Sequence, residues 1–424
     1  MDTTEARATR ALVLHPDITS YPDRRDPQHA LDEAVSLARA LPALDVVSAE
    51  LVRLPKPQPG LLFGKGKTAE LAAFIKRDEI DLVLVDGPVT PVQQRNLERE
   101  WKVKLLDRTG LILEIFSDRA ATREGVLQVE MAALSYQRTR LVRAWTHLER
   151  QRGGLGFVGG PGETQIEADR RAIDEQLNRL RKQLDKVVKT RGLHRAARAK
   201  VPYPIVAIVG YTNAGKSTLF NRLTGAEVMA KDMLFATLDP TMRSVTLPTG
   251  RDVILSDTVG FISELPTQLV AAFRATLEEV LAADLIVHVR DISHPETEEQ
   301  ADDVMTILSA LGVGEDTPIL NVWNKIDRLS STERSALLVE ASRKDEIVAM
   351  SALGGEGIDD MIAEITRILD RDRKAERLHL SHADGRRRAW LYQQGVVTSE
   401  TETDDGALLD VYWTSTQAVR FSRL

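Results

Sequence analysis

The chain has 424 residues and no cysteine, with 43% hydrophobic residues, 28% charged residues and a formal net charge of −7. This length exceeds one compact core, so we expect two to four domains of an ordinary soluble type, without disulfides or cysteine-based zinc sites. The polar first ten residues do not resemble a secretory signal, and no apolar run approaches the roughly 18 residues of a membrane span. We therefore expect a cytoplasmic protein with no membrane span.

The first 115 residues predict a small α/β domain. Four apolar runs favour strands, at residues 10–16, 44–52, 81–87 and 103–108, and three stretches between them favour helices, at residues 31–41, 67–77 and 90–101. Such alternation is typical of a parallel sheet, and the run LVLV fits a strand that is buried on both faces. The motif FGKGK at residues 63–67 precedes a helix and could bind a phosphate, although glycine turns with solvated lysines are common in that position.

Residues 116–200 predict a helical hairpin with a glycine-rich tip. Apolar residues follow helical spacing along two stripes, the first at Leu127, Met131, Leu134, Leu141, Trp145 and Leu148, and the second at Ile166, Ile173, Leu177, Leu180, Leu184 and Val187. The joining stretch, residues 150–165, is rich in glycine, which interrupts a helix. Residues 138–200 hold 16 Lys/Arg against 7 Asp/Glu, a net of +9, so the rest of the chain carries −16. This asymmetry indicates one surface that faces a polyanion, or alternatively a well-solvated pair of helices.

The remainder predicts two further α/β regions. Strand and helix patterns alternate across residues 201–370, with apolar runs at residues 205–210, 252–258, 285–291, 318–325 and 346–352. Residues 371–424 predict a small α+β domain with a helix at 386–395 and a hairpin turn at the DDG of residues 404–406. The expected fold class is therefore α/β multidomain: an N-terminal α/β domain with a long helical hairpin, a central P-loop domain, and a small α+β C-terminal domain.

The stretch GYTNAGKST has the form of a P-loop, because it follows an apolar strand and opens a helix. Its glycines let backbone N–H groups point at phosphate oxygens, Lys216 can reach the β- and γ-phosphates, and the Ser217 hydroxyl can bind Mg²⁺. All its residues are candidates for nucleotide binding: Gly210, Tyr211, Thr212, Asn213, Ala214, Gly215, Lys216, Ser217 and Thr218.

Two later motifs complete a guanine-nucleotide site. Asp257 ends an apolar run and can hold Mg²⁺ through water, and the N–H of Gly260, three residues on, can sense a γ-phosphate. Asp327, in the NKID of residues 324–327, can accept from N1–H and the exocyclic amino group of guanine, whereas adenine offers neither donor there. Asn324 and Lys325 share that motif, and a backbone N–H near Ser351 and Ala352 could bind the guanine carbonyl.

The stretch LFATLDPT lies between the P-loop and Asp257 and contains the candidate switch residues. Thr237 is placed to meet Mg²⁺ and the γ-phosphate, with Thr241 as the competing choice and Phe235 as a neighbouring nucleotide contact. The expected catalytic residues are therefore Lys216, Thr237 and Gly260, and the expected magnesium ligands are Ser217, Thr237 and Asp257.

On these motifs the chain resembles the HflX family of translational GTPases, within the Obg–HflX branch of P-loop GTPases. The stretches that carry the resemblance span about residues 61–358: FGKGKTAEL, REGVLQVEMAAL, GGPGETQIEADRR, GYTNAGKSTLFNRLT, FATLDPT, DTVGFISELPTQLVAAFRATLEE and NKID. The resemblance implies a monomeric GTPase that is stimulated by the ribosome, binds the large ribosomal subunit and its rRNA, and splits or recycles stalled ribosomes under stress. The alternative is a GTP-dependent assembly factor for that subunit; a protein-interaction switch without RNA fits the +9 segment poorly.

The resemblance also bears on individual residues. Relatives carry an apolar residue after the glycine of the DxxG motif, as this chain does with Phe261, which cannot orient water by hydrogen bonding. Asn213 occupies the position of a K⁺ ligand in K⁺-stimulated relatives, or else stabilises the loop turn. Many members have an Arg before GPGE in the tip; here Gly160 stands there, with Arg150 and Arg152 nearby. Some members are credited with a second, adenine-nucleotide activity in the N-terminal region.

Overall fold

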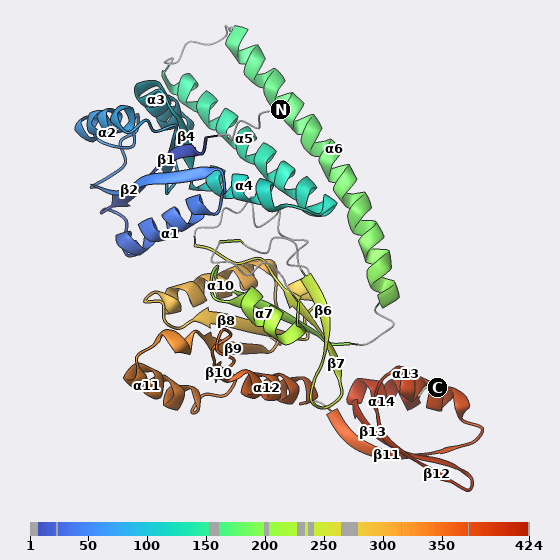
Figure 1. The fold of residues 1–424 in the computed structure, drawn as a ribbon. Coiled ribbons are helices and arrows are strands. Elements are labelled where there is room, and N and C mark those ends of the chain that lie inside the picture. Colours follow the sequence, from blue (N-terminus) through green and yellow to red (C-terminus); the bar gives the residue numbers. More distant parts are fainter. Residues whose placement is uncertain are drawn as a thin grey trace, which may run out of the picture. The chain divides into compact units, whose positions relative to one another are not determined.

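The structure is a computed structural model that describes residues 7–22, 24–151, 161–198, 203–226, 234–235, 241–263, 279–314, 316–371 and 373–422. Its contacts divide the chain into two compact units. Unit 1 contains the described residues among 1–188, 231–239 and 262–275, and unit 2 contains those among 189–230, 240–261 and 276–424. Figure 1 labels the helices and strands of each unit.

Unit 1 is built on a four-stranded parallel sheet in the order β2-β1-β3-β4. Helices α2 and α3 lie on one face of this sheet, and α1 and α4 lie on the other (Figure 1). The four strands and four helices alternate along the chain: β1 Thr9–Ile18, α1 Pro27–Arg39, β2 Leu44–Leu54, α2 Lys65–Arg77, β3 Leu82–Val85, α3 Pro91–Trp101, β4 Lys104–Asp107 and α4 Arg108–Arg119.

Helix α1 begins four residues before its expected start. The Asp26 carboxylate caps it by accepting from the backbone N–H groups of Gln28 and His29, at 2.9 and 3.1 Å, and Pro27 takes the first helical position. Helix α4 was not predicted, because the apolar run at residues 111–116 follows β4 directly and shows no helical spacing of its own.

Two long helices follow, α5 Arg123–Gln151 and α6 Pro161–Arg198. In unit 1 the Arg138 guanidinium on α5 pairs with Asp174 on α6, with Nε and Oδ1 2.7 Å apart, and Gln176 donates to Glu130 at 3.3 Å. Leu127 on α5 and Leu177 and Leu180 on α6 are buried, as the apolar stripes predicted. The expected glycine-rich tip, with Arg152 and Gly160, lies outside the described residues.

Unit 2 contains a six-stranded sheet in the order β10-β9-β8-β5-β7-β6, parallel except for the edge strand β6. Its elements are β5 Ile205–Gly210, α7 Lys216–Thr224, β6 Thr241–Thr246, β7 Asp252–Asp257, β8 Leu285–Asp291, α10 Thr297–Leu311, β9 Ile319–Asn324, α11 Ser331–Ala341, β10 Ile347–Ala349 and α12 Ile358–Asp370. Buried aliphatic side chains from β5, β7, β8 and β9 form its core. Strand β6 was not predicted, because TMRSVT is mostly polar and half-exposed.

The C-terminal part of unit 2 is a three-stranded antiparallel sheet, β11-β13-β12, that packs on two helices around Trp413 and Phe421. The elements are β11 Arg373–Ser381, α13 Gly385–Gln393, β12 Val397–Thr403, β13 Gly406–Thr414 and α14 Ser415–Ser422. The expected hairpin turn is confirmed at residues 404–405, and so is the α/β multidomain class. Within the described part of the chain, no helix combines the length and apolarity that crossing a bilayer requires.

Candidate active site

The P-loop turn of unit 2 connects the buried strand β5 to α7. The Lys216 ammonium donates to the Tyr211 carbonyl oxygen at 2.7 Å, and only 6% of this residue is exposed. Gly215 has φ of 97°, and a Cβ there would lie 2.3 Å from Nδ2 of Asn324, so the position admits only glycine. The backbone of the turn therefore encloses the lysine ammonium, as in loops that bind anions.

The Lys216 ammonium is electrostatically poised for an anion. Burial lowers its pKa to about 8, since the charged form loses its water, and nearby Asp257 offsets only part of that effect. Phosphate oxygens would supply the negative charge that the ammonium lacks in this enclosed position.

A hydroxyl and a carboxylate meet beside this lysine. Asp257, the last residue of β7, is fully buried, and its Oδ2 accepts a hydrogen bond from the Ser217 hydroxyl at 2.9 Å. Both are hard oxygen ligands, which Mg²⁺ prefers, and Mg²⁺ usually binds one or two carboxylates together with waters and substrate phosphates. This donor set fits a magnesium ion.

The segment after Asp257 lies directly on the P-loop. A Cβ on Gly260 would lie 2.8 Å from Cγ2 of Thr212 and 3.1 Å from Nζ of Lys216, so glycine is required for this close approach. The next residue is tied down on both sides: the N–H of Thr212 donates to the Phe261 carbonyl at 2.7 Å, and the N–H of Phe261 donates to the Gly210 carbonyl at 3.1 Å. The Phe261 residue is only 1% exposed, so its ring has a packing role in the core.

The expected base-binding residues are brought together at the ends of β9 and β10. The Ser351 hydroxyl donates to Oδ1 of the exposed Asp327 at 2.5 Å. Asn324 is buried and links two loops, because its Nδ2 donates to the Ala214 carbonyl and its Oδ1 accepts from the Ala352 N–H, both at 2.8 Å. The Lys325 ammonium donates to Asp291 at 2.7 Å. In this structure the Ala352 N–H thus donates to Asn324 and helps to hold the two loops together.

One residue of this corner had no signal in the sequence. The Arg222 guanidinium on α7 donates to the carbonyls of Ala352 and Leu353, at 2.8 and 2.5 Å, and so holds the loop that follows β10. Arg222 lies 130 positions before Ala352 in the sequence. An arginine on a helix is as compatible with an exposed, solvated position, so only the folded structure reveals this contact.

The candidate switch residues are placed differently from one another. Thr237 lies outside the described residues, and Thr241 is the first residue of β6, where it pairs with Asp257. Phe235 belongs to unit 1, where its ring meets Phe116 of α4 edge-on with centroids 4.7 Å apart. Asn213 has φ of 59°, a conformation that asparagine tolerates better than most residues.

Four family models match consecutive parts of the chain. They describe a GTP-binding GTPase N-terminal region at residues 28–117, a GTP-binding GTPase middle region at 119–198, a 50S ribosome-binding GTPase at 205–325 and an HflX C-terminal domain at 336–424.

Whole-length relatives carry the same family name. A GTPase HflX of Magnetococcus marinus is 51% identical over 96% of this chain and 92% of its own length, and one of Escherichia coli strain K12 is 42% identical over 94% and 92%. Another, from Caldanaerobacter subterraneus, is 45% identical over 81% of this chain and 78% of its own length. Taken with the lysine, serine and aspartate that converge at the P-loop, these matches show that the chain belongs to the HflX family of GTPases.

Proposed function

We propose that this GTPase binds the large ribosomal subunit under the control of its nucleotide and splits or recycles stalled ribosomes. The contact that supports the nucleotide half is the Ser217–Asp257 hydrogen bond beside the buried Lys216. The ribosomal half is supported by the match of residues 205–325 to a family described as 50S ribosome-binding GTPases, and by the +9 charge of residues 138–200.

Each part of the site has an assigned role in this proposal. Lys216 holds the β- and γ-phosphates, and the Gly260 N–H contacts the γ-phosphate. Ser217, Asp257 and Thr237 hold Mg²⁺, which when bound neutralises charge on the phosphate oxygens. The base is recognised by Asp327 and by the loop at Ser351 and Ala352, with Asn324 and Lys325 bracing them. Phe261 is buried and cannot orient water, so the missing catalytic or ordering group has to come either from partner docking or from a K⁺ ion bound at Asn213.

Intact ribosomes distinguish the two candidate roles. Incubated with the protein and GTP or a non-hydrolysable analogue, they should dissociate into subunits, and the large subunit should accelerate GTP hydrolysis. Binding confined to immature particles would instead identify an assembly factor. The same hydrolysis assay in K⁺ and in Na⁺ tests the proposed cation role of Asn213: a faster rate in K⁺ supports it, whereas equal rates favour a turn residue.

The basic helix α6 should supply phosphate contacts. Every Lys and Arg of α6 between residues 170 and 189 is exposed. Replacing Arg170, Arg181 and Lys182 together with alanine should weaken binding to the large subunit, because each phosphate contact releases a counterion. The slope of log affinity against log salt should fall by about one per lost contact, as measured by co-sedimentation at several salt concentrations.

The matched control removes the same charge from another surface of unit 1. Arg95 and Arg99 on α3 and Lys104 on β4 are also exposed, and their replacement with alanine should leave the slope unchanged. If the two triple variants bind with identical salt slopes, α6 does not carry the RNA contact.

A further inference from the structure

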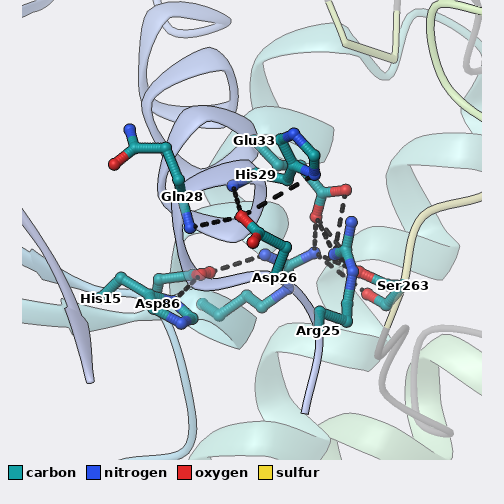
Figure 2. A network of polar contacts seen from close by, with 9 residues as sticks. His15, Arg25, Asp26, Gln28, His29, Glu33, Asp86 and Ser263 are labelled. Atoms are coloured by element: carbon teal, nitrogen blue, oxygen red, sulfur yellow. Dashed lines mark hydrogen bonds and ion pairs between the residues drawn. The ribbon is translucent and has the colours of Figure 1, made fainter. Parts of the chain in front are cut away.

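Ser263, three residues after Gly260, is held by a polar cluster of unit 1, which we call the Ser263 cluster: Arg25, Glu33, Asp86, Arg108 and Ser263 itself. The Ser263 hydroxyl accepts from Arg25 at 2.5 Å and from Arg108 at 3.2 Å, and it donates to Glu33 at 3.2 Å. Its carbonyl oxygen also accepts from Arg108 at 3.1 Å. Figure 2 shows Arg25 and Glu33 converging on Ser263, which is 4% exposed.

Arg108 makes this cluster rigid. It is buried, donates from Nη1 to Asp86 at 2.6 Å, and pairs with Glu33 through Nη2. Although burial by itself would lower the pKa of Arg108, the carboxylates of Asp86 and Glu33 raise it above its ordinary value. His15 on β1 contacts the second oxygen of Asp86 at 2.8 Å (Figure 2). A planar guanidinium that is paired at both ends has little freedom, so whatever it donates to is held in place.

The cluster lies where the carboxyl ends of parallel strands meet. Asp86 follows β3, Arg108 follows β4, and His15 lies near the end of β1. Elements of the same sheet therefore fix all three positions, independently of residues 257–263. These strands belong to the core of unit 1, so the side chains of the Ser263 cluster are attached to a well-packed sheet.

The anchored residue is close in sequence to the proposed γ-phosphate contact. Phe261 is bonded to the P-loop on both sides in unit 2, and the chain enters unit 1 at Ile262. Only Ile262 thus separates a residue that the P-loop holds from one that the Ser263 cluster holds. Gly260 is therefore linked to Ser263 through two residues, Phe261 and Ile262. Phe235, in the candidate switch stretch LFATLDPT, also contacts a residue of unit 1, because its ring packs against the ring of Phe116.

We propose that Arg108 is a positioning residue for the GTPase reaction, acting through Ser263 to hold the Gly260 N–H where it meets the γ-phosphate. The inference rests on the role proposed above for Gly260. GDP has no γ-phosphate, so Arg108 contributes to the binding of the triphosphate and leaves GDP binding unaffected. The readout is therefore the ratio of the affinity for a non-hydrolysable GTP analogue to that for GDP, measured on the full-length chain.

Two conservative variants weaken the hydrogen bonds of the Ser263 cluster while keeping most of its side-chain atoms. Arg108→Lys keeps the buried charge but cannot donate to Asp86, Glu33 and Ser263 together, and Ser263→Ala removes only the hydroxyl. Ser263→Ala loses the three hydrogen bonds of the hydroxyl, and Arg108→Lys loses part of the arginine's set. Each variant should lower the analogue-to-GDP ratio about three- to tenfold, and kcat should fall with it. Arg119→Lys is the matched control, since Arg119 lies on the same helix and donates to Ala40, away from the cluster.

The outcomes are separable. Gly260→Ala, whose Cβ would collide with Thr212, tests the parent assignment. If Gly260→Ala lowers the ratio but both anchor variants keep it unchanged or raise it, the proposed role of Arg108 is wrong and that of Gly260 stands. If Gly260→Ala also leaves the ratio unchanged, the γ-phosphate assignment itself fails. Thermal unfolding of each variant confirms that the comparison is made on folded protein.

Discussion

Replacing Lys216 with methionine should reduce kcat for GTP hydrolysis on the order of 10²- to 10³-fold, because a preorganised cation at the transferring phosphate stabilises charge in the transition state. Methionine has a similar length without the ammonium, so the turn around it can still close. Lys374→Met, at an exposed position on β11, is the control and should hydrolyse GTP at the original rate. A Lys216 variant that keeps within a few fold of that rate would remove the lysine from the catalytic residues.

The lowered pKa of Lys216 adds a pH dependence. The group is charged below its pKa of about 8 and neutral above it, and a bound triphosphate favours the charged form. GTP affinity should therefore be highest below pH 8 and fall about fourfold between pH 7 and 8.5. Titration calorimetry in buffers of different ionisation enthalpy should show proton uptake on binding near pH 8. The Lys216→Met variant should show neither the fall nor the uptake.

Asp327→Asn should change the base that the site accepts. In the proposed site the Asp327 carboxylate accepts two hydrogen bonds from guanine, each worth about 1.5–3 kcal/mol because the acceptor is charged. An asparagine amide presents one acceptor and one donor, so GTP affinity should fall on the order of 10²-fold or more. Xanthosine triphosphate carries a carbonyl where guanine has its amino group, and the variant should bind it better than the unmodified protein does.

The exposed Asp302 on α10 provides the control, since Asp302→Asn removes the same charge from a helix that contains none of the proposed base-binding residues. Competition of a fluorescent guanine nucleotide with GTP, ATP and xanthosine triphosphate measures all three preferences. A variant at Asp327 that still prefers GTP over xanthosine triphosphate would show that this carboxylate does not read the base.

Local sequence determined the elements that neighbouring residues can specify by themselves. The LVLV run forms β3, buried along its whole length, and the DDG turn joins β12 to β13 as expected. The P-loop and the DxxG and NKID motifs lie together, because each follows a strand and the ends of parallel strands converge at one edge of a sheet. Chain order and strand periodicity therefore suffice to locate the candidate site.

Tertiary structure decided which residues brace that site. Arg222 reaches the loop after β10, and Arg108 and Glu33 reach Ser263 across 155 and 230 positions. Arginine and glutamate on helices are usually solvated, so no spacing rule separates these from their exposed neighbours. Likewise β6 is a strand only because β7 offers it an edge. Which residues become partners across long stretches of sequence depends on which buried surfaces pack together. The spacing of neighbouring residues does not contain that information.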